Sequence, residues 1–419
     1  MVALVVVLLL VIGSSSPKHS GSANTDSSSA KSASGAGGAG GSSSSFHLAS
    51  ASPAPGEQNV APNTTISLTF SAPVSLHAAA PTLTPDIAGK WVQKNATTLT
   101  YALDSPLIPS TQVEVTIPGG AHGLRSTQGA TLDASRTVDF VVAAGDTLRL
   151  QQLLAQLNYL PVGFTPSGPA PSRVDLAQDQ PGTFSWRWPG LPSALTTQWT
   201  QGTMNQITKA AIEAFETQNG IGVDGIAGPT VWTNLINDVI NGKPDATPYV
   251  YVLVNKVVPQ SLTLWNNGVA QYAGIPINSG APGADTTDGT YAVFEHVRYS
   301  EMKGTNVDGS TYDDPNVPYA SYFNGGDALH GFIRASYGSP QSNGCVEMSY
   351  ADAALVWPLT PIGTLVTVEG PNFGTAPPPT TTTTTTAPAA TTTTAAPAPA
   401  PAAPVPAVTT TTAAAAPAG

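Results

Sequence analysis

Apolar residues recur at two different spacings along this chain, and the changes between these spacings constrain the fold. From residue 66 to 142, and again from 249 to 368, apolar and polar residues alternate. Between those stretches, residues 150 to 239 carry apolar residues three or four positions apart. Alternation is typical of half-buried strands, and the wider spacing is typical of amphipathic helices. The sequence therefore predicts a multidomain protein with a β segment, a helical segment and a second, mostly β segment.

Low-complexity sequence flanks this pattern. Residues 14–45 are dominated by Ser, Gly, Ala and Asn, and residues 375–419 by Thr, Ala and Pro. Neither segment can bury enough apolar surface to offset its ordering entropy, so both are expected to be disordered. Residues 46–374 remain for two or three domains. The Thr/Ala/Pro-rich tail has two interpretations, a stalk with O-linked sugars or a bare spacer.

Charge and the first residues bear on partners and location. The chain has 15 Lys and Arg against 26 Asp and Glu, a formal net charge of −11. It has no basic run, so nucleic acid is not expected as a partner. Residues 1–13 form an apolar stretch that is short for a bilayer span and matches the core of a signal peptide. Export is expected, with this segment either a signal peptide or the remnant of a membrane anchor.

The first folded segment, residues 46–145, predicts a small antiparallel β-sandwich. Its apolar alternation recurs in several short runs separated by Pro, Gly and Asn. The opening residues 52–62, SPAPGEQNVAP, resemble the entry to bacterial Ig-like domains of surface proteins. This segment carries no catalytic constellation, and a spacer role is expected.

The second segment, residues 146–245, predicts a small three-helix bundle, with Pro229 at the favoured first turn of the last helix. Its strings LQQLLAQLNY, AIEAF and VDGIAGPTVW resemble the peptidoglycan-binding domain type 1. This resemblance implies a wall-binding role. An insertion of about forty residues, 161–202, departs from that family. It is interpreted as a lid, an extra binding surface or a contact to a neighbouring domain.

The third segment, residues 249–370, predicts a mostly β domain. Asn267-Gly268 marks a hairpin turn, and a short helix is expected after the cysteine, capped by Ser349. Residues 303–319 are rich in Gly, Asn and Asp and are interpreted as a long loop. Long loops over a site often serve as lids.

Cys345 is the one cysteine of the chain, and it lies fifteen positions after His330. A lone cysteine forms no intramolecular disulfide, which leaves a buried small hydrophobe or a nucleophile as its interpretation. A thiolate is a strong nucleophile, and a histidine is the usual base that generates it.

Four pieces of the third segment resemble the YkuD-type L,D-transpeptidase catalytic domain. They are the hairpin entry, TTDGTY at 286–291, His330-Gly331 with SNGCV at 342–346, and GTLV at 363–366. The resemblance implies that Cys345 is the nucleophile, that His330 is its base and that a carbonyl at Gly331 orients the imidazole. Because Gly344 permits close backbone approach, the amides of Gly344 and Cys345 are candidate oxyanion donors.

Substrate-binding candidates surround this pair. They are Ser342, Asn343, Arg334 and Tyr322. An arginine can grip a stem carboxylate with two hydrogen bonds, although a surface role for it is an equal alternative. The tyrosine is expected either to line a donor groove or to pack in the core.

The resemblance also implies a reaction. The enzyme would transfer the acyl group of a peptidoglycan tetrapeptide stem to its cysteine, release D-alanine and pass the acyl group to the amine of a second stem, giving a 3→3 cross-link. No metal or cofactor is expected, and carbapenem β-lactams are expected inhibitors. Two alternatives remain: the same acyl-enzyme resolved by water or a protein amine, and a non-catalytic wall-binding scaffold.

Two residues depart from the usual family motif. Asn343 replaces a histidine, and it cannot act as a base because an amide does not titrate. Glu347 stands where Arg or Asn is common, and a carboxylate near the thiol would raise the pKa of the cysteine. Our interpretation is that Glu347 points toward the N-terminus of the following helix, where the helix dipole stabilises it.

Overall fold

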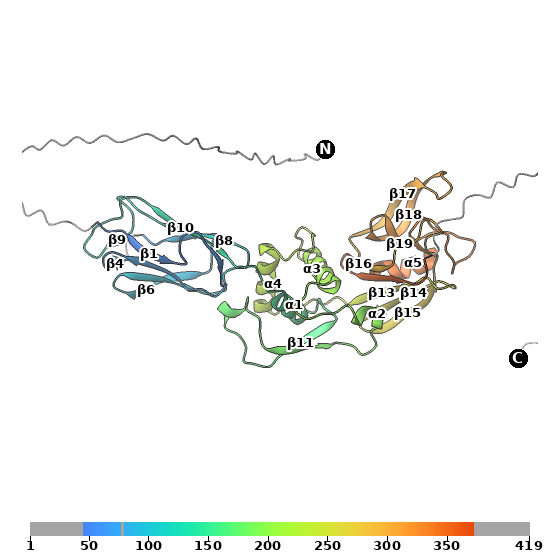
Figure 1. The fold of residues 1–419 in the computed structure, drawn as a ribbon, viewed down its shortest axis with the longest axis horizontal. Coiled ribbons are helices and arrows are strands. Elements are labelled where there is room, and N and C mark those ends of the chain that lie inside the picture. The colour runs from blue at the N-terminus through green and yellow to red at the C-terminus, as the bar shows by residue number, and fades with distance from the viewer. Residues whose placement is uncertain (1–44, 77–78, 373–419) are drawn as a thin grey trace, which may run out of the picture. The chain divides into compact units, whose positions relative to one another are not determined.

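The computed structural model describes residues 45–76 and 79–372 (Figure 1). The predicted leader, the Ser/Gly-rich linker and the C-terminal tail lie outside the described residues. The described chain forms two compact units. Among the described residues, one unit comprises 45–57, Thr65–Leu103 and Val113–Phe140, and the remaining described residues form the other.

A β-sandwich of two four-stranded sheets begins the described chain. Its strand orders are β1–β3–β7–β6 and β2–β10–β8–β5, and a small sheet pairs β4 with β9. The bounds are β1 Leu48–Ser52, β2 Glu57–Val60, β3 Ile66–Phe70, β4 Val74–Ser75, β5 Thr82–Thr84, β6 Gly89–Asn95, β7 Thr98–Leu103, β8 Gln112–Ile117, β9 Arg125–Ser126 and β10 Arg136–Val142. The alternating residues point inward, as in β3, where Ile66, Leu68 and Phe70 are at most 2% exposed. The predicted sandwich is confirmed.

Three helices follow, α1 (Thr147–Gln156), α3 (Gln206–Gln218) and α4 (Pro229–Asn241). The Asp146 side chain caps α1 by accepting hydrogen bonds from the Leu148 and Arg149 amides. Helix α4 begins at Pro229, as predicted, and ends at Gly242 in the left-handed conformation. The predicted three-helix segment is therefore present.

These helices share a hydrophobic core with the sheet that follows them. Leu153, Ile212 and Leu235 belong to the same buried cluster as Tyr251 and Leu365 of the C-terminal segment, and all five are at most 1% exposed. A side chain in such a cluster is stabilised by neighbours from both segments. The helical and C-terminal segments are therefore parts of one folded body.

The insertion 161–202 adds to this contact. It contains β11 (Val162–Pro166) paired with β12 (Gly182–Trp186), a 3₁₀ turn η1 (Arg173–Asp175) and a short helix α2 (Ser193–Thr196). The Trp188 ring stacks on Tyr249 with centroids 6.0 Å apart, and the Gln198 amide donates to the Thr290 hydroxyl at 2.7 Å. Of the three interpretations, the structure shows a contact with a neighbouring segment.

The C-terminal segment consists of two sheets and a short helix. One sheet has the order β15–β14–β13–β21–β16 and the other β17–β18–β19–β20. The bounds are β13 Val250–Asn255, β14 Ser261–Asn266, β15 Val269–Pro276, β16 Gly289–Ala292, β17 Glu295–Thr305, β18 Thr311–Asn324, β19 Asp327–Gly331, β20 Val346–Met348, α5 Tyr350–Val356, η2 Trp357–Leu359 and β21 Leu365–Glu369. Val252 and Leu262 of the first sheet share a core with Leu329 and Val346 of the second. Asn267 and Gly268 form the predicted turn between β14 and β15, both with positive φ.

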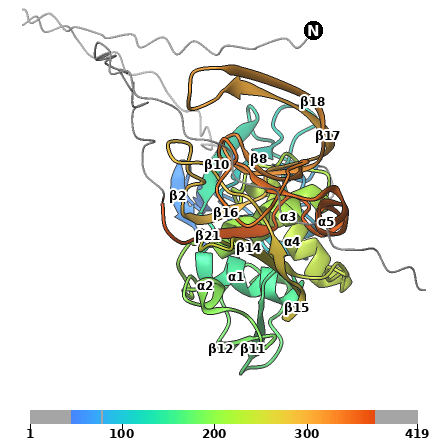
Figure 2. The same ribbon diagram turned by 90° about the vertical axis from the view of Figure 1, so that its right-hand side faces the viewer.

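The predicted loop at 303–319 is wrong. Strands β17 and β18 form a long antiparallel hairpin whose register runs to Thr305 opposite Thr311, and it projects from the sheet (Figure 2). Its outer part is exposed on one face and only half-buried on the other, so it needs no strict apolar alternation. Backbone hydrogen bonds pair the strands whatever the side chains are, which is why its polar composition resembles that of a loop.

Helix α5 follows β20 and fixes the end of the cysteine-bearing strand. The Ser349 hydroxyl accepts a hydrogen bond from the Asp352 amide at 3.1 Å, which caps the helix as predicted. Among the described residues, no helix has the length and apolarity needed to cross a membrane.

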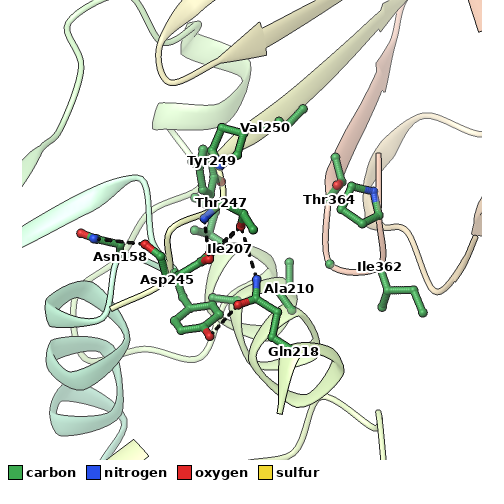
Figure 3. Close-up of a pocket in the computed structure, with 16 residues that line it drawn as sticks. Asn158, Ile207, Ala210, Gln218, Asp245, Thr247, Tyr249, Val250, Ile362 and Thr364 are labelled. Atoms are coloured by element: carbon green, nitrogen blue, oxygen red, sulfur yellow. Dashed lines mark hydrogen bonds between the residues drawn. The ribbon is translucent and has the colours of Figure 1, made fainter. Parts of the chain in front are cut away.

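A small cavity of about 70 Å³ lies between the helices and the C-terminal sheet (Figure 3). Polar side chains on its wall bond one another: the Tyr159 hydroxyl donates to Gln218, whose amide donates to Thr247. The wall carries no nucleophile or histidine. This cavity is part of the contact between segments, so the candidate chemistry is elsewhere.

Candidate active site

A second cavity, of about 230 Å³, brings together the β17–β18 hairpin, β19 and the loop before β20. Its lining residues are Met302, Asn306, Tyr312, Asp314, His330, Phe332, Arg334, Asn343, Cys345 and Glu347. Five residues singled out from the sequence line it: His330, Arg334, Asn343, Cys345 and Glu347. The hairpin residues were not predicted, because that segment had been interpreted as a loop.

Strand pairing explains why the cysteine and the histidine face the same cavity. Strands β19 and β20 run parallel, with Leu329 opposite Val346 and His330 opposite Glu347. One step back along both strands, Cys345 is level with Ala328, and a backbone hydrogen bond from Ala328 reaches the sulfur. Residues two apart on a strand share a face, so Cys345 lies on the same face as His330.

The His330 ring is held in one tautomer. It is 3% exposed, and its Nδ1 lies 3.1 Å from the Gly331 carbonyl oxygen. A carbonyl only accepts, so Nδ1 carries the proton and Nε2 presents a lone pair. This is the contact that the sequence led us to expect of Gly331. Burial is the main influence that lowers the His330 pKa, so the ring is neutral at pH 7.

The cysteine is a protonated thiol at rest. The pKa of Cys345 is raised to about 12, mainly by burial; the carboxylates of Asp327 and Glu347 also raise it, while the Ala328 hydrogen bond lowers it. The side chain is still partly accessible, and its Sγ lies 3.6 Å from the Gly326 carbonyl oxygen. A nucleophilic thiolate must therefore form as the thiol attacks, by loss of its proton to a neighbouring base.

The loop before the cysteine is held by its own serine. Ser342 is 2% exposed; its hydroxyl donates to the Cys345 carbonyl at 2.5 Å and accepts from the Gly344 amide at 3.2 Å. Two predictions need correction here. Ser342 bonds the loop backbone and does not line the cavity, and the Gly344 amide is occupied, so of the two candidate oxyanion donors only the Cys345 amide remains a candidate. Gly344 has φ +120, and a Cβ there would collide with the Asp327 carboxylate, so only glycine fits.

Glu347 does not interact with the helix dipole, contrary to our interpretation. The Arg334 Nε and Nη2 atoms each lie 2.7 Å from a different oxygen of the Glu347 carboxylate, which makes a bidentate ion pair on the cavity wall. Ser349 and Asp352 occupy the N-terminus of α5 instead. This pair also occupies the fork of Arg334 that we expected to bind a stem carboxylate.

The two remaining candidates differ in position. Asn343 is exposed at the cavity, where its amide donates to the Asn306 side chain of the hairpin at 2.7 Å. Tyr322 does not line the cavity; its hydroxyl bonds Ser300 at 2.7 Å and its ring lies near Phe294. The predicted substrate contact of Tyr322 is therefore not supported.

Asp327 is a site residue that the sequence did not reveal. Burial raises its pKa to about 6. Its carboxylate approaches Gly344, and it acts on the cysteine through its charge. Its position three residues before His330 was the one sequence feature that could have indicated a place in the site. An acidic residue at such a position is also compatible with an ordinary surface or structural role. Within residues 45–76 and 79–372, no three His, Cys, Asp or Glu side chains converge as a metal site requires.

Comparison with known families assigns this segment. Residues 249–368 match the L,D-transpeptidase catalytic domain, so the chain contains a catalytic domain of that class. Residues 43–142 match the bacterial Ig-like domain. The chain thus carries a YkuD-type L,D-transpeptidase domain together with an Ig-like domain. These matches do not extend to the helical segment, whose resemblance to peptidoglycan-binding modules stays a prediction. The search among curated proteins found no match.

Solved L,D-transpeptidases align with 30% to 78% of this chain, with TM-scores of 0.26 to 0.27. The enzyme from Mycobacterium smegmatis is 12% identical, with 78% of this chain and 99% of that chain covered and a TM-score of 0.27. L,D-transpeptidase 3 from Mycobacterium tuberculosis, solved with a faropenem-derived adduct, is 15% identical, with 77% and 98% covered and a TM-score of 0.27. The E. faecium catalytic domain is 23% identical, with 30% and 100% covered and a TM-score of 0.26. The family assignment rests on the sequence match.

Proposed function

We propose that this protein is an exported L,D-transpeptidase that forms 3→3 cross-links in peptidoglycan through an acyl group on Cys345. The observation that carries the proposal is the shared face of His330 and Cys345 in one cavity, with the imidazole held by Gly331. This arrangement leaves Nε2 of a neutral imidazole available as the base for a protonated thiol. The match to the catalytic domain supports the same reaction class.

The acylation step follows from these protonation states. The Cys345 sulfur attacks the carbonyl carbon of the third residue of a donor stem while His330 Nε2 takes the thiol proton. The oxyanion that forms is placed near the Cys345 amide. When the intermediate collapses, the C–N bond to the terminal D-alanine breaks, and His330 returns the proton to the leaving amine. A thioester on Cys345 remains.

The second step resolves this thioester. The side-chain amine of an acceptor stem attacks the thioester carbonyl and gives a proton to His330. The C–S bond then breaks, the cross-link forms, and the proton returns to the sulfur. Water or a protein amine in the same place would give a carboxypeptidase or an anchoring enzyme by the same route, and the cavity does not choose between these acceptors.

The non-catalytic scaffold is disfavoured by two contacts. Glu347 is paired with Arg334 at 2.7 Å, and among the causes that raise the Cys345 pKa its charge ranks after burial and Asp327. Asn343 makes an amide contact with the hairpin and is not required as a base while His330 is in place. Neither departure from the usual motif removes a group that the proposed reaction needs.

The other segments have supporting roles in the proposal. The helical segment would bind peptidoglycan, the Ig-like domain would act as a spacer, and residues 1–13 would direct or anchor the chain outside the cytoplasm. The support for these roles is the sequence resemblance of the helices and the apolar composition of the first residues.

Covalent labelling with a carbapenem tests the central claim. The E. faecium catalytic domain has been solved acylated by ertapenem, so ertapenem is the probe. We expect the intact mass of the full chain to increase by one ertapenem adduct that peptide mapping places on Cys345. Cys345→Ser should show no adduct, and His330→Asn should be acylated about 10²- to 10⁴-fold more slowly, the usual range for loss of a general base. Absence of an adduct on the folded wild-type chain would contradict the proposal.

Stem peptides then identify the acceptor. Incubation of the full chain with tetrapeptide stems, followed by mass spectrometry, separates the outcomes. A dimer that has lost one D-alanine indicates transpeptidation, and a tripeptide without dimer indicates hydrolysis. The Cys345→Ser chain provides the background for both products.

A further inference from the structure

Gly344 and Cys345 carry four backbone polar groups around the nucleophile, and the fold occupies three of them. The Gly344 amide and the Cys345 carbonyl bond the Ser342 hydroxyl. The Gly344 carbonyl accepts a hydrogen bond of 2.6 Å from the Thr286 hydroxyl. Within the part of the chain that the structure describes, the Cys345 amide has no acceptor. That amide is the group that the proposed reaction requires.

Thr286 is buried, and its hydroxyl takes part in two hydrogen bonds. Its side chain is 0% exposed, and its hydroxyl also accepts from the Gly280 amide at 2.9 Å. A hydroxyl has one proton, and the Gly280 amide is itself a donor, so the Thr286 hydroxyl donates its proton to the Gly344 carbonyl. The contact therefore has a fixed direction.

Peptide geometry carries this contact to the nucleophile. The Gly344 carbonyl and the Cys345 amide belong to the same planar trans peptide, in which C=O and N–H point in opposite directions. A hydroxyl that fixes the carbonyl on one side consequently fixes the N–H on the other. We propose that Thr286 is a positioning residue that aims the Cys345 amide at the oxyanion of the acyl-transfer intermediate.

A buried lysine holds Thr286 in place. Lys256 is 0% exposed; its ammonium donates to the Thr286 carbonyl at 2.8 Å and pairs with the Asp288 carboxylate at 2.8 Å. Its third partner is the Asn372 side chain. An ammonium is removed from water at a large cost unless it is fully paired, so this lysine fixes the backbone around Thr286 rigidly. Lys256 thus holds Thr286 in place, and Thr286 in turn holds the Gly344–Cys345 peptide.

This inference rests on the proposed function, and its test separates the two. Thr286→Val keeps the shape and removes the hydroxyl, Thr286→Ser keeps the hydroxyl, and Thr287→Val makes the same change at the exposed neighbouring residue. Two rates are measured on each full chain: acylation by ertapenem, which passes through an oxyanion, and alkylation of Cys345 by iodoacetamide, which does not.

We expect Thr286→Val to slow acylation about 10- to 100-fold, somewhat less than the loss of a complete oxyanion donor, with alkylation within about twofold of wild type. Thr286→Ser and Thr287→Val should be acylated at nearly the wild-type rate. The carbonyl stretch of the ertapenem thioester, measured by infrared difference spectroscopy, should move to higher frequency in Thr286→Val because its hydrogen bond is weaker.

The contrary outcomes are distinct. A wild-type chain that is not acylated removes the proposed function and this inference together. A wild-type chain that is acylated, with Thr286→Val equally fast or with alkylation slowed in parallel, removes the inference alone. Thr286→Ala replaces the valine variant if that variant does not fold. Failure of both to fold while Thr286→Ser folds would show a structural role and would also overturn the proposal.

Discussion

The negative charge of Asp327 opposes the deprotonation of Cys345. Its carboxylate lies against Gly344, and after burial it is the leading influence that raises the Cys345 pKa. Its own pKa is raised to about 6, so it is mostly ionised at pH 7 and only partly ionised near pH 5. The reactivity of the thiol therefore depends on two titrations, that of His330 and that of Asp327.

Replacing Asp327 by Asn should make the cysteine more reactive. Asn keeps the size of the side chain and removes the charge, so the Cys345 pKa should fall. Since burial is the larger cause, we expect the shift to stay below one unit and iodoacetamide alkylation at pH 8 to rise about 3- to 8-fold. A rate equal to or below that of wild type would contradict the assigned electrostatic influence. Glu369→Gln, which neutralises an exposed carboxylate of the same segment, serves as the control.

The same substitution has a signed effect on stability. The pKa of Asp327 is higher in the folded chain than the usual unfolded value of about 3.9, so the folded state holds the proton more tightly. The stabilisation from this proton is present below pH 4 and is lost as pH rises through about 6. Asp327→Asn should therefore gain about 1 kcal/mol over wild type between pH 4 and 7, a figure reduced for solvent screening because the residue is partly exposed. Urea unfolding at four pH values measures the difference.

At the scale of elements, the β17–β18 hairpin decides the shape of the cavity. Four of its residues line the cavity, and its tip reaches the cysteine loop through the Asn306–Asn343 contact at 2.7 Å. Asn343 is exposed and Asn306 is half-buried, so the contact adds little to global stability. Its effect should be local, on how the hairpin closes over the cavity.

A double-mutant cycle tests this contact. Asn306→Ala and Asn343→Ala should each slow ertapenem acylation about 2- to 5-fold, the effect of one exposed hydrogen bond, and the double variant should be no slower than the slower single variant. The free energy of unfolding should change by less than about 0.5 kcal/mol in all three. Additive effects on the acylation rate would show that the two side chains act separately.

The success of the sequence predictions differed between elements for physical reasons. Pro229 and Asn267-Gly268 act through local backbone preferences, and both appear where predicted. The hairpin has a local turn signal in Asp308-Gly309, but its outer strands lack the apolar alternation that predicts strands. The pair Cys345 and His330 could be identified from residue type and spacing. The roles of Ser342, Gly344 and Glu347 could not, because they depend on which donors and acceptors the fold brings together.

At the scale of the molecule, the shared core makes the helices and the catalytic sheet one cooperative unit. Ile212 of α3 is 0% exposed in the cluster that contains Tyr251 and Leu365. We expect Ile212→Ala to lower the free energy of unfolding of the catalytic segment by about 2–5 kcal/mol, although Ile212 is more than a hundred residues from Cys345 in sequence. Labelling of Cys345 with a maleimide at increasing urea measures this transition.

Leu68→Ala is the matched control. Leu68 is also 0% exposed, but it lies in the sandwich, which belongs to the other compact unit. This variant should lower the stability of the sandwich and leave the exposure of Cys345 to maleimide unchanged. Equal midpoints for Cys345 labelling in wild type and Ile212→Ala would contradict the single cooperative unit.

Residues 161–202 and the helices contact the catalytic sheet. These contacts also fix the distance between the helical segment and the Cys345 thiol. Two modules on a flexible linker search for their ligands independently, at an effective concentration that depends on the linker. Here Trp188 and Gln198 contact the C-terminal segment directly, so under the proposed function a ligand bound by the helices would be kept at a constant distance from the thiol. In the proposed reaction, the dimensions of this rigid unit would therefore determine the spacing of the cross-links along a glycan strand.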